Sequence, residues 1–106
     1  MMFRVFVIGC GRIATGFSKF DLSSHGAVFK KNKDTQIFGC FDVNKKNSEN
    51  FANMYNCKAY KSLKLAIHET KPDIISICTP DETHFEILKV ILTSDFEVRI
   101  ILAEKP

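Results

Sequence analysis

The sequence predicts a doubly wound α/β domain, in which helices cover both faces of a mostly parallel sheet with a strand order near 3-2-1-4-5. Two observations lead to this prediction. Short apolar runs alternate along the chain with segments of helical spacing, and the apolar runs end in small or polar residues. Such alternation is typical of β-α-β units, whose right-handed crossovers build a parallel sheet. A length of 106 residues fits a single domain of this class.

The strands are expected where short stretches of the chain are mostly apolar. The first run is β-branched and nearly continuous, the pattern of a strand buried on both faces. A shorter run after the second predicted helix adds one brief strand. In chain order, the expected strands cover residues 3–8, 36–41, 57–60, 73–78 and 98–102.

Helices are expected between these strands because apolar residues recur there at intervals of three and four. Asn44, Ser62 and Asp81 each stand at the start of such a segment and can cap it. The segment after the first strand is interrupted by Gly16 and Asp21, before a second helical stretch begins. The expected helices include residues 25–31, 48–55, 63–67 and 85–92.

Composition and charge exclude several classes of function. No apolar run approaches the ~20 residues of a membrane span, and no signal peptide is visible, so a cytoplasmic protein is expected. The net charge is +3 with scattered lysine groups, which argues against nucleic-acid binding. The four cysteines form no C-x-x-C pair, so buried thiols are expected and no structural metal.

Residues 9–14, GCGRIA, follow the first strand and fit the pattern G-x-G-x-x-G/A. In this pattern Gly9 permits a tight turn, Gly11 lets a diphosphate approach the backbone, and Ala14 lets helix and strand pack closely. The backbone N–H groups of Arg12 and Ile13 would open the helix, where an anion is favoured. These residues predict a dinucleotide site.

An acidic residue, Asp42, ends the second strand and completes this fingerprint, because its carboxylate can accept hydrogen bonds from both ribose hydroxyls. This favours NAD, with NADP possible because Lys45 and Lys46 stand close by. A methyltransferase fold shares the same strand, glycine and acid order. Its loop usually carries a third glycine where this chain has Ile13, and titration with NAD, NADP and S-adenosylmethionine separates the two classes.

These motifs, with residues 76–84 (SICTPDETH) and 104–106 (EKP), resemble the glucose-fructose oxidoreductase, inositol dehydrogenase and rhizopine-catabolism family (Gfo/Idh/MocA). The resemblance covers the whole chain in order. It implies a Rossmann-type domain in which Cys78, Thr79, Pro80 and His84 lie beside the nicotinamide half of the cofactor. Asp81 replaces the asparagine that is common in the family's T-P-N-x-x-H segment, which puts a charge near the nicotinamide.

The resemblance also assigns roles to the final residues. Glu104 matches the residue that contacts the nicotinamide ribose, and Lys105 matches the catalytic lysine that reaches the substrate hydroxyl. It implies that residues 1–106 are the cofactor domain of a longer oxidoreductase acting on a sugar or cyclitol, inactive without its substrate domain. Self-association through an uncovered apolar surface is also expected. The alternative is a stand-alone module that binds a dinucleotide and senses it without catalysis.

Overall fold

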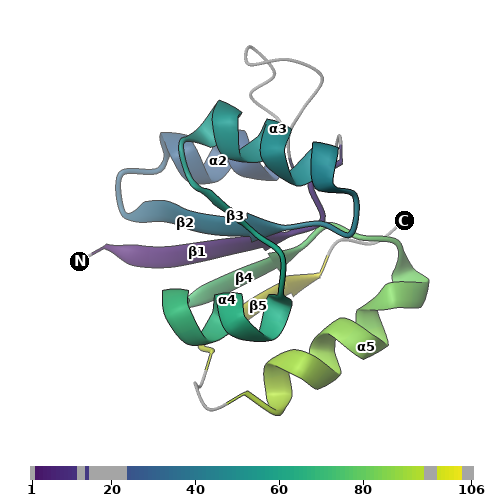
Figure 1. Cartoon of the computed structure of the whole chain (residues 1–106). Coiled ribbons are helices and arrows are strands. Elements are labelled where there is room, and N and C mark those ends of the chain that lie inside the picture. Colours follow the sequence, from purple (N-terminus) through teal and green to yellow (C-terminus); the bar gives the residue numbers. More distant parts are fainter. Residues whose placement is uncertain (1, 12–13, 15–23, 95–97, 104–106) are drawn as a thin grey trace.

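The computed structural model describes residues 2–11, 14, 24–94 and 98–103. One parallel sheet of five strands has the order β3-β2-β1-β4-β5 (Figure 1), so the predicted class and strand order are confirmed. The elements in chain order are β1 (Phe3–Ile8), α2 (His25–Lys31), β2 (Thr35–Phe41), α3 (Lys45–Tyr55), β3 (Lys58–Tyr60), α4 (Leu63–Thr70), β4 (Ile74–Ile77), α5 (Asp81–Leu92) and β5 (Ile100–Ala103).

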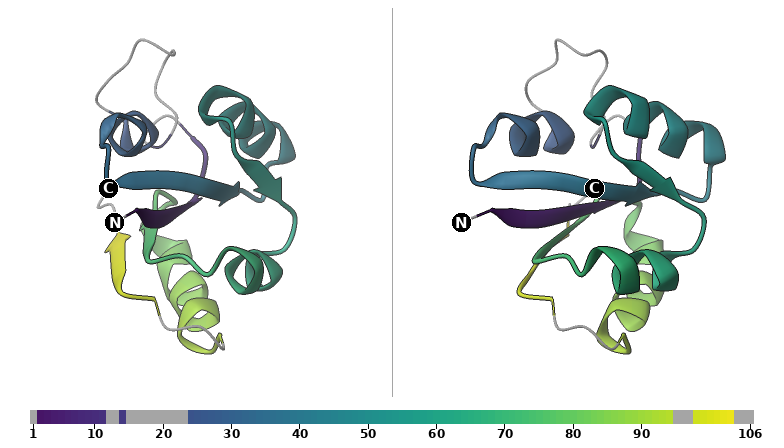
Figure 2. Two further views of the ribbon diagram at one scale, coloured as in Figure 1. Left: turned by 90° about the vertical axis from the view of Figure 1, so that its left-hand side faces the viewer. Right: turned by 60° about the vertical axis from the view of Figure 1, so that its left-hand side comes forward.

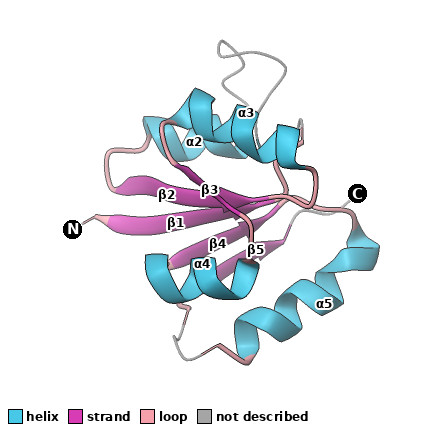
Figure 3. Ribbon diagram, viewed as in Figure 1, coloured by secondary structure: helices cyan, strands magenta, loops and turns pink. Residues whose placement is uncertain are grey.

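The sheet is the middle of three layers. Helices α2 and α3 cover one face, and α4 and α5 cover the other (Figures 2 and 3). Strand β1 contributes side chains to the hydrophobic cores on both faces of the sheet, since successive side chains on a strand point to opposite faces. Val5 and Val7 pack into the core under α2 and α3, whereas Phe6 and Ile8 pack into the core under α4 and α5.

Two of the three predicted helix caps are confirmed. The Asn44 side chain accepts a hydrogen bond from the Asn47 backbone N–H, and Ser62 caps α4 in the same way. The prediction that Asp81 caps α5 is wrong, because the helix begins at Asp81 and Pro80 occupies the cap position without a side-chain hydrogen bond. Pro80 has φ −59°, a value that its ring fixes and that already suits a helix start.

The register of the central strands places their carboxyl ends at one edge of the sheet. Ile8, the last residue of β1, pairs with Phe41 at the end of β2 and with Ile77 at the end of β4. The residues that follow these three must therefore meet at this edge. Ligands of open α/β sheets bind there, outside the carboxyl ends of the strands.

All four cysteines are thiols with no disulfide between them. Cys10 and Cys40 are buried as expected, whereas Cys57 and Cys78 are only partly buried. Over the described residues, none of the helices has the length and apolar character that crossing a bilayer demands.

Candidate functional site

A cleft of about 550 Å³ lies at the carboxyl ends of β1, β2 and β4. It is bounded on one side by the start of α3 and on the other by the first two turns of α5. Six of the predicted site residues line it, and they come from three separate segments. These residues are Gly9, Gly11, Asp42, Cys78, Thr79 and Pro80.

The glycine turn closes the end of β1. Gly9 has φ +88°, and a Cβ at this position would lie 2.7 Å from Thr79 Cγ2 and 2.9 Å from the Cys78 carbonyl carbon. Glycine is therefore required here for two reasons: φ is positive, and the segment after β4 lies too close to leave room for a Cβ. A Cβ at Gly11, by contrast, would meet no atom within 4 Å. The turn thus leaves open space over Gly11, where the glycine pattern predicts a diphosphate.

Asp42 is held by backbone donors on both sides. Its Oδ2 accepts from the Cys10 N–H at 2.7 Å, and its Oδ1 accepts from the Asn44 N–H at 2.8 Å. A carboxylate has about four acceptor positions, so each oxygen keeps capacity for a further donor such as a ribose hydroxyl. The side chain is half-buried and lines the cleft. Asp42 therefore ties the glycine turn to the end of β2, a role that the sequence did not indicate.

The segment after β4 forms the opposite wall. The Cys78 N–H donates to the Ile8 carbonyl at 2.7 Å, which keeps this segment in register with β1. The Thr83 hydroxyl oxygen lies 2.7 Å from both the Thr79 hydroxyl oxygen and the Pro80 carbonyl oxygen. These contacts hold the turn that leads into α5.

His84 is not among the residues that line the cleft. Its Nε2 lies 2.9 Å from the Thr79 carbonyl oxygen, and because a carbonyl only accepts, Nε2 is the protonated nitrogen. His84 therefore stabilises the turn at Thr79 through its carbonyl and does not itself line the cleft. The remaining predicted site residues lie outside the described residues: Arg12, Ile13, Glu104 and Lys105.

Several residues of the cleft were not predicted. Val43 follows Asp42 and is 93% exposed, and Ile87 stands across the cleft from the α5 side. Glu82 and Glu86 lie four apart on α5 and both line the cleft. The helical spacing of this segment could have indicated Glu82 and Glu86 together, because positions four apart share one face of a helix.

The thiols of Cys40 and Cys57 pack in the core under α2 and α3. Hydrogen bonding to Cys10, together with burial, raises the pKa of the Cys40 thiol far above its ordinary value. Hydrogen bonding to Cys40 and burial likewise raise the pKa of the Cys57 thiol. Nucleophilic and redox cysteines need the thiolate. Cys40 and Cys57 therefore serve as packing groups of this core.

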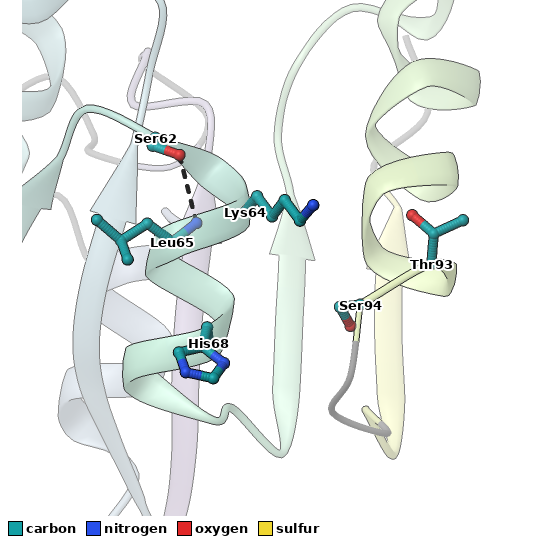
Figure 4. Close-up of a pocket in the computed structure, with 6 residues that line it drawn as sticks. All are labelled: Ser62, Lys64, Leu65, His68, Thr93 and Ser94. Atoms are coloured by element: carbon teal, nitrogen blue, oxygen red, sulfur yellow. Dashed lines mark hydrogen bonds between the residues drawn. The ribbon is translucent and has the colours of Figure 1, made fainter.

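A second groove of about 360 Å³ lies between α4 and α5 (Figure 4). Its hydroxyl groups serve the local backbone: Ser62 accepts from the Leu65 N–H, and Thr93 and Ser94 donate to carbonyls of α5. None of the predicted site residues lines it. The groove is therefore separate from the cleft at the strand ends.

Comparison with known proteins agrees with this geometry. Residues 3–106 match the GFO_IDH_MocA family, which is described as an oxidoreductase family with an NAD-binding Rossmann fold. The chain belongs to the GFO_IDH_MocA family. The resemblance inferred from the motifs is thereby confirmed. The match also favours an NAD-binding Rossmann domain over the alternative of a methyltransferase fold.

Individual relatives of this GFO_IDH_MocA domain are longer proteins. UDP-N-acetylglucosamine 3-dehydrogenase of Acidithiobacillus ferrooxidans is 29% identical over 103 residues, which are 97% of this chain and 28% of the relative. A structure of that enzyme superposes with a TM-score of 0.74 at 28% identity, covering 100% of this chain and 30% of the other. Myo-inositol dehydrogenase of Corynebacterium glutamicum has a TM-score of 0.76 at 23% identity, covering 100% and 28%. The chain thus spans 28% of the length of the curated relative.

Proposed function

We propose that the cleft holds NAD with the adenosine ribose at Asp42, the diphosphate over Gly9 and Gly11, and the nicotinamide half beside Cys78. The observation that carries this proposal is the register of β1, β2 and β4. It brings the glycine turn, the carboxylate and the segment after β4 to one edge of the sheet. The open space over Gly11 fits a diphosphate, and Asp42 keeps acceptor capacity for ribose hydroxyls.

We further propose that this domain serves an oxidoreductase that transfers hydride between the cofactor and a hydroxyl or carbonyl of a sugar or cyclitol. The names of the relatives, a nucleotide-sugar dehydrogenase and an inositol dehydrogenase, support this substrate class. When bound, nicotinamide supplies the hydride acceptor or donor. Arg12 and Ile13 would then bind the diphosphate through their backbone N–H groups.

The other assigned residues would act at the nicotinamide end. Thr79 and Pro80 would form the wall of the site there, with His84 holding the Thr79 carbonyl from behind. Glu104 would contact the nicotinamide ribose. The Lys105 ammonium would hydrogen-bond the substrate hydroxyl and favour its deprotonation as hydride leaves.

Residues 1–106 alone should bind NAD and show no dehydrogenase turnover on sugars or cyclitols. Much of an enzyme's rate comes from positioning the substrate. About 70% of the length of the curated relative lies outside the region that this chain matches. The measurement is NADH absorbance over hours with a panel of sugars and cyclitols, beside calorimetry of NAD binding. Substrate-dependent NADH formation by this chain would overturn the proposal that this domain binds the cofactor but needs a substrate domain for turnover.

Cofactor choice should depend on Asp42. The carboxylate would repel the 2′-phosphate of NADP and lose a ribose hydroxyl, so NAD should bind roughly tenfold more tightly, about 1.4 kcal/mol. The Lys45 ammonium lies 3.8 Å from the Glu49 carboxylate in an exposed pair within α3, so part of its charge is balanced there. Calorimetric titration with each cofactor measures the ratio.

Asp42→Asn should bring the NAD to NADP ratio close to one, since an amide carries no charge to repel the phosphate. Asp34→Asn is the matched control: Asp34 is exposed in the turn before β2 and does not line the cleft. It should leave the ratio unchanged. Tighter binding of NADP by the unmodified chain would count against the role of Asp42.

Apolar side chains remain exposed on the last helix and strand. Phe85 and Leu92 of α5 are 71% and 75% exposed, and Ile100 and Leu102 of β5 are each more than 40% exposed. Exposed apolar groups of this size favour association. They support the proposal that this domain self-associates or is covered by further chain in a longer protein.

A further inference from the structure

A line of three polar side chains runs along the face of the sheet that α2 covers and reaches the cleft. His25 Nδ1 lies 2.8 Å from the Ser76 hydroxyl oxygen, and that oxygen lies 3.6 Å from Cys78 Sγ. Cys78 lines the cleft. We propose that His25 and Ser76 are positioning residues that orient the Cys78 thiol toward the nicotinamide half of the cofactor. This inference rests on the proposed function, which places that half beside Cys78.

Ser76 is unusual for its place in the fold. It lies in β4 between Ile75 and Ile77, and its side chain is fully buried. A buried hydroxyl costs stability unless it is hydrogen-bonded. Ser76 meets that requirement through contacts with His25 on one side and Cys78 on the other. The serine therefore links a helix on one face of the sheet to the cleft at its edge.

The Ser76 hydroxyl carries one hydrogen, which couples the two contacts. When His25 Nδ1 carries a hydrogen, Ser76 accepts it and directs its own hydrogen to Cys78 Sγ. When Nδ1 is bare, Ser76 donates to it, and the Cys78 thiol donates to Ser76. The hydrogen on His25 is thus coupled through Ser76 to the direction of the contact between Ser76 and the Cys78 thiol.

His25 is held in place by the packing of α2. It is the first residue of the helix, and the preceding Ser24 caps it by accepting from the Ala27 N–H. The Ser24 hydroxyl also lies 3.1 Å from the Tyr55 hydroxyl, which ties the cap to α3. A Cβ at Gly26 would lie 2.5 Å from the Tyr55 ring. The helix start therefore has little freedom to shift, which suits a positioning role for His25.

The test compares two ligands that differ only at the nicotinamide. NAD and ADP-ribose share the adenosine, the diphosphate and the second ribose, but ADP-ribose lacks the nicotinamide ring. His25→Ala and Ser76→Ala should each weaken NAD binding roughly threefold to tenfold, the range of one net hydrogen bond, and change ADP-ribose binding less than about twofold. A loss that is equal for both ligands would show a merely structural role and overturn the proposal.

Two variants act as controls. His68→Ala removes an exposed histidine of α4 that lines the separate groove (Figure 4), and it should alter neither affinity. His25→Asn places an amide near the position of Nδ1, so it should restore most of the NAD affinity that His25→Ala loses. Failure of this rescue, with the variant folded by circular dichroism, would contradict a role for the hydrogen bond at Nδ1.

A double-mutant cycle tests whether His25 acts through Cys78. In a Cys78→Ala background, His25→Ala should produce no further change in the ratio of NAD to ADP-ribose affinity. Additive losses would mean that His25 affects the cofactor by another route and would overturn the proposed line. If instead the unmodified chain bound neither ligand, the proposed function itself would fail, a result distinct from any outcome among the variants.

Discussion

Gly11→Val is expected to weaken NAD binding by at least tenfold, about 1.4 kcal/mol, while the domain stays folded. A Cβ at Gly11 would meet no atom within 4 Å, and Gly11 is exposed at the glycine turn. The valine side chain therefore fits the protein without its cofactor. Its methyl groups would nevertheless occupy the space into which the diphosphate must come.

The measurement pairs calorimetric titration of NAD with circular dichroism of each variant. Gly11→Ala gives an intermediate case, because one methyl group fills less of the cleft, and its affinity should fall between those of the unmodified chain and Gly11→Val. An unchanged affinity in a folded Gly11→Val variant would mean that residues 9–14 form a turn without a diphosphate site.

The parts of the site that follow directly from strand order were predictable from the sequence. Each apolar run ends in a recognisable residue, and parallel strands in register bring those ends together. Gly9, Asp42 and Cys78 were therefore placed correctly at one edge of the sheet.

Contacts between distant segments could not be predicted in the same way. The hydrogen bond between His25 and Ser76 joins residues 51 apart, and it depends on where α2 rests on the sheet. The second role of Asp42, as acceptor for the Cys10 N–H, depends on the path of the glycine turn. Neither local propensity nor hydrophobic period carries this information.

Strand ends were also less predictable than strand identities. The last expected strand was predicted to begin at Val98, but β5 begins at Ile100. The Asp73 carbonyl accepts from both the Arg99 and the Ile100 N–H groups, at 3.1 and 3.0 Å. The chain therefore enters the ladder only after this shared acceptor, a detail of hydrogen bonding that residue types do not show.

Gly9→Ala is expected to reduce the free energy of unfolding by about 2 to 4 kcal/mol, in contrast to Gly11→Ala two positions later. At φ +88° an alanine is strained, and its Cβ would lie 2.9 Å from the Cys78 carbonyl carbon and 3.0 Å from the Cys78 carbonyl oxygen. These are backbone atoms, and the Cys78 N–H is bonded to the Ile8 carbonyl at 2.7 Å. The neighbouring strand end cannot yield without breaking this bond.

A loss of this size is a large fraction of the 5 to 15 kcal/mol that usually stabilises a domain. Urea unfolding followed by circular dichroism measures it, with Gly11→Ala as the matched control that should stay within about 0.5 kcal/mol of the unmodified chain. Equal stability of the two alanine variants would show that the turn accommodates a side chain at Gly9. Because the same contact sets the distance between the glycine turn and the segment after β4, Gly9→Ala should also weaken NAD binding in the fraction that remains folded.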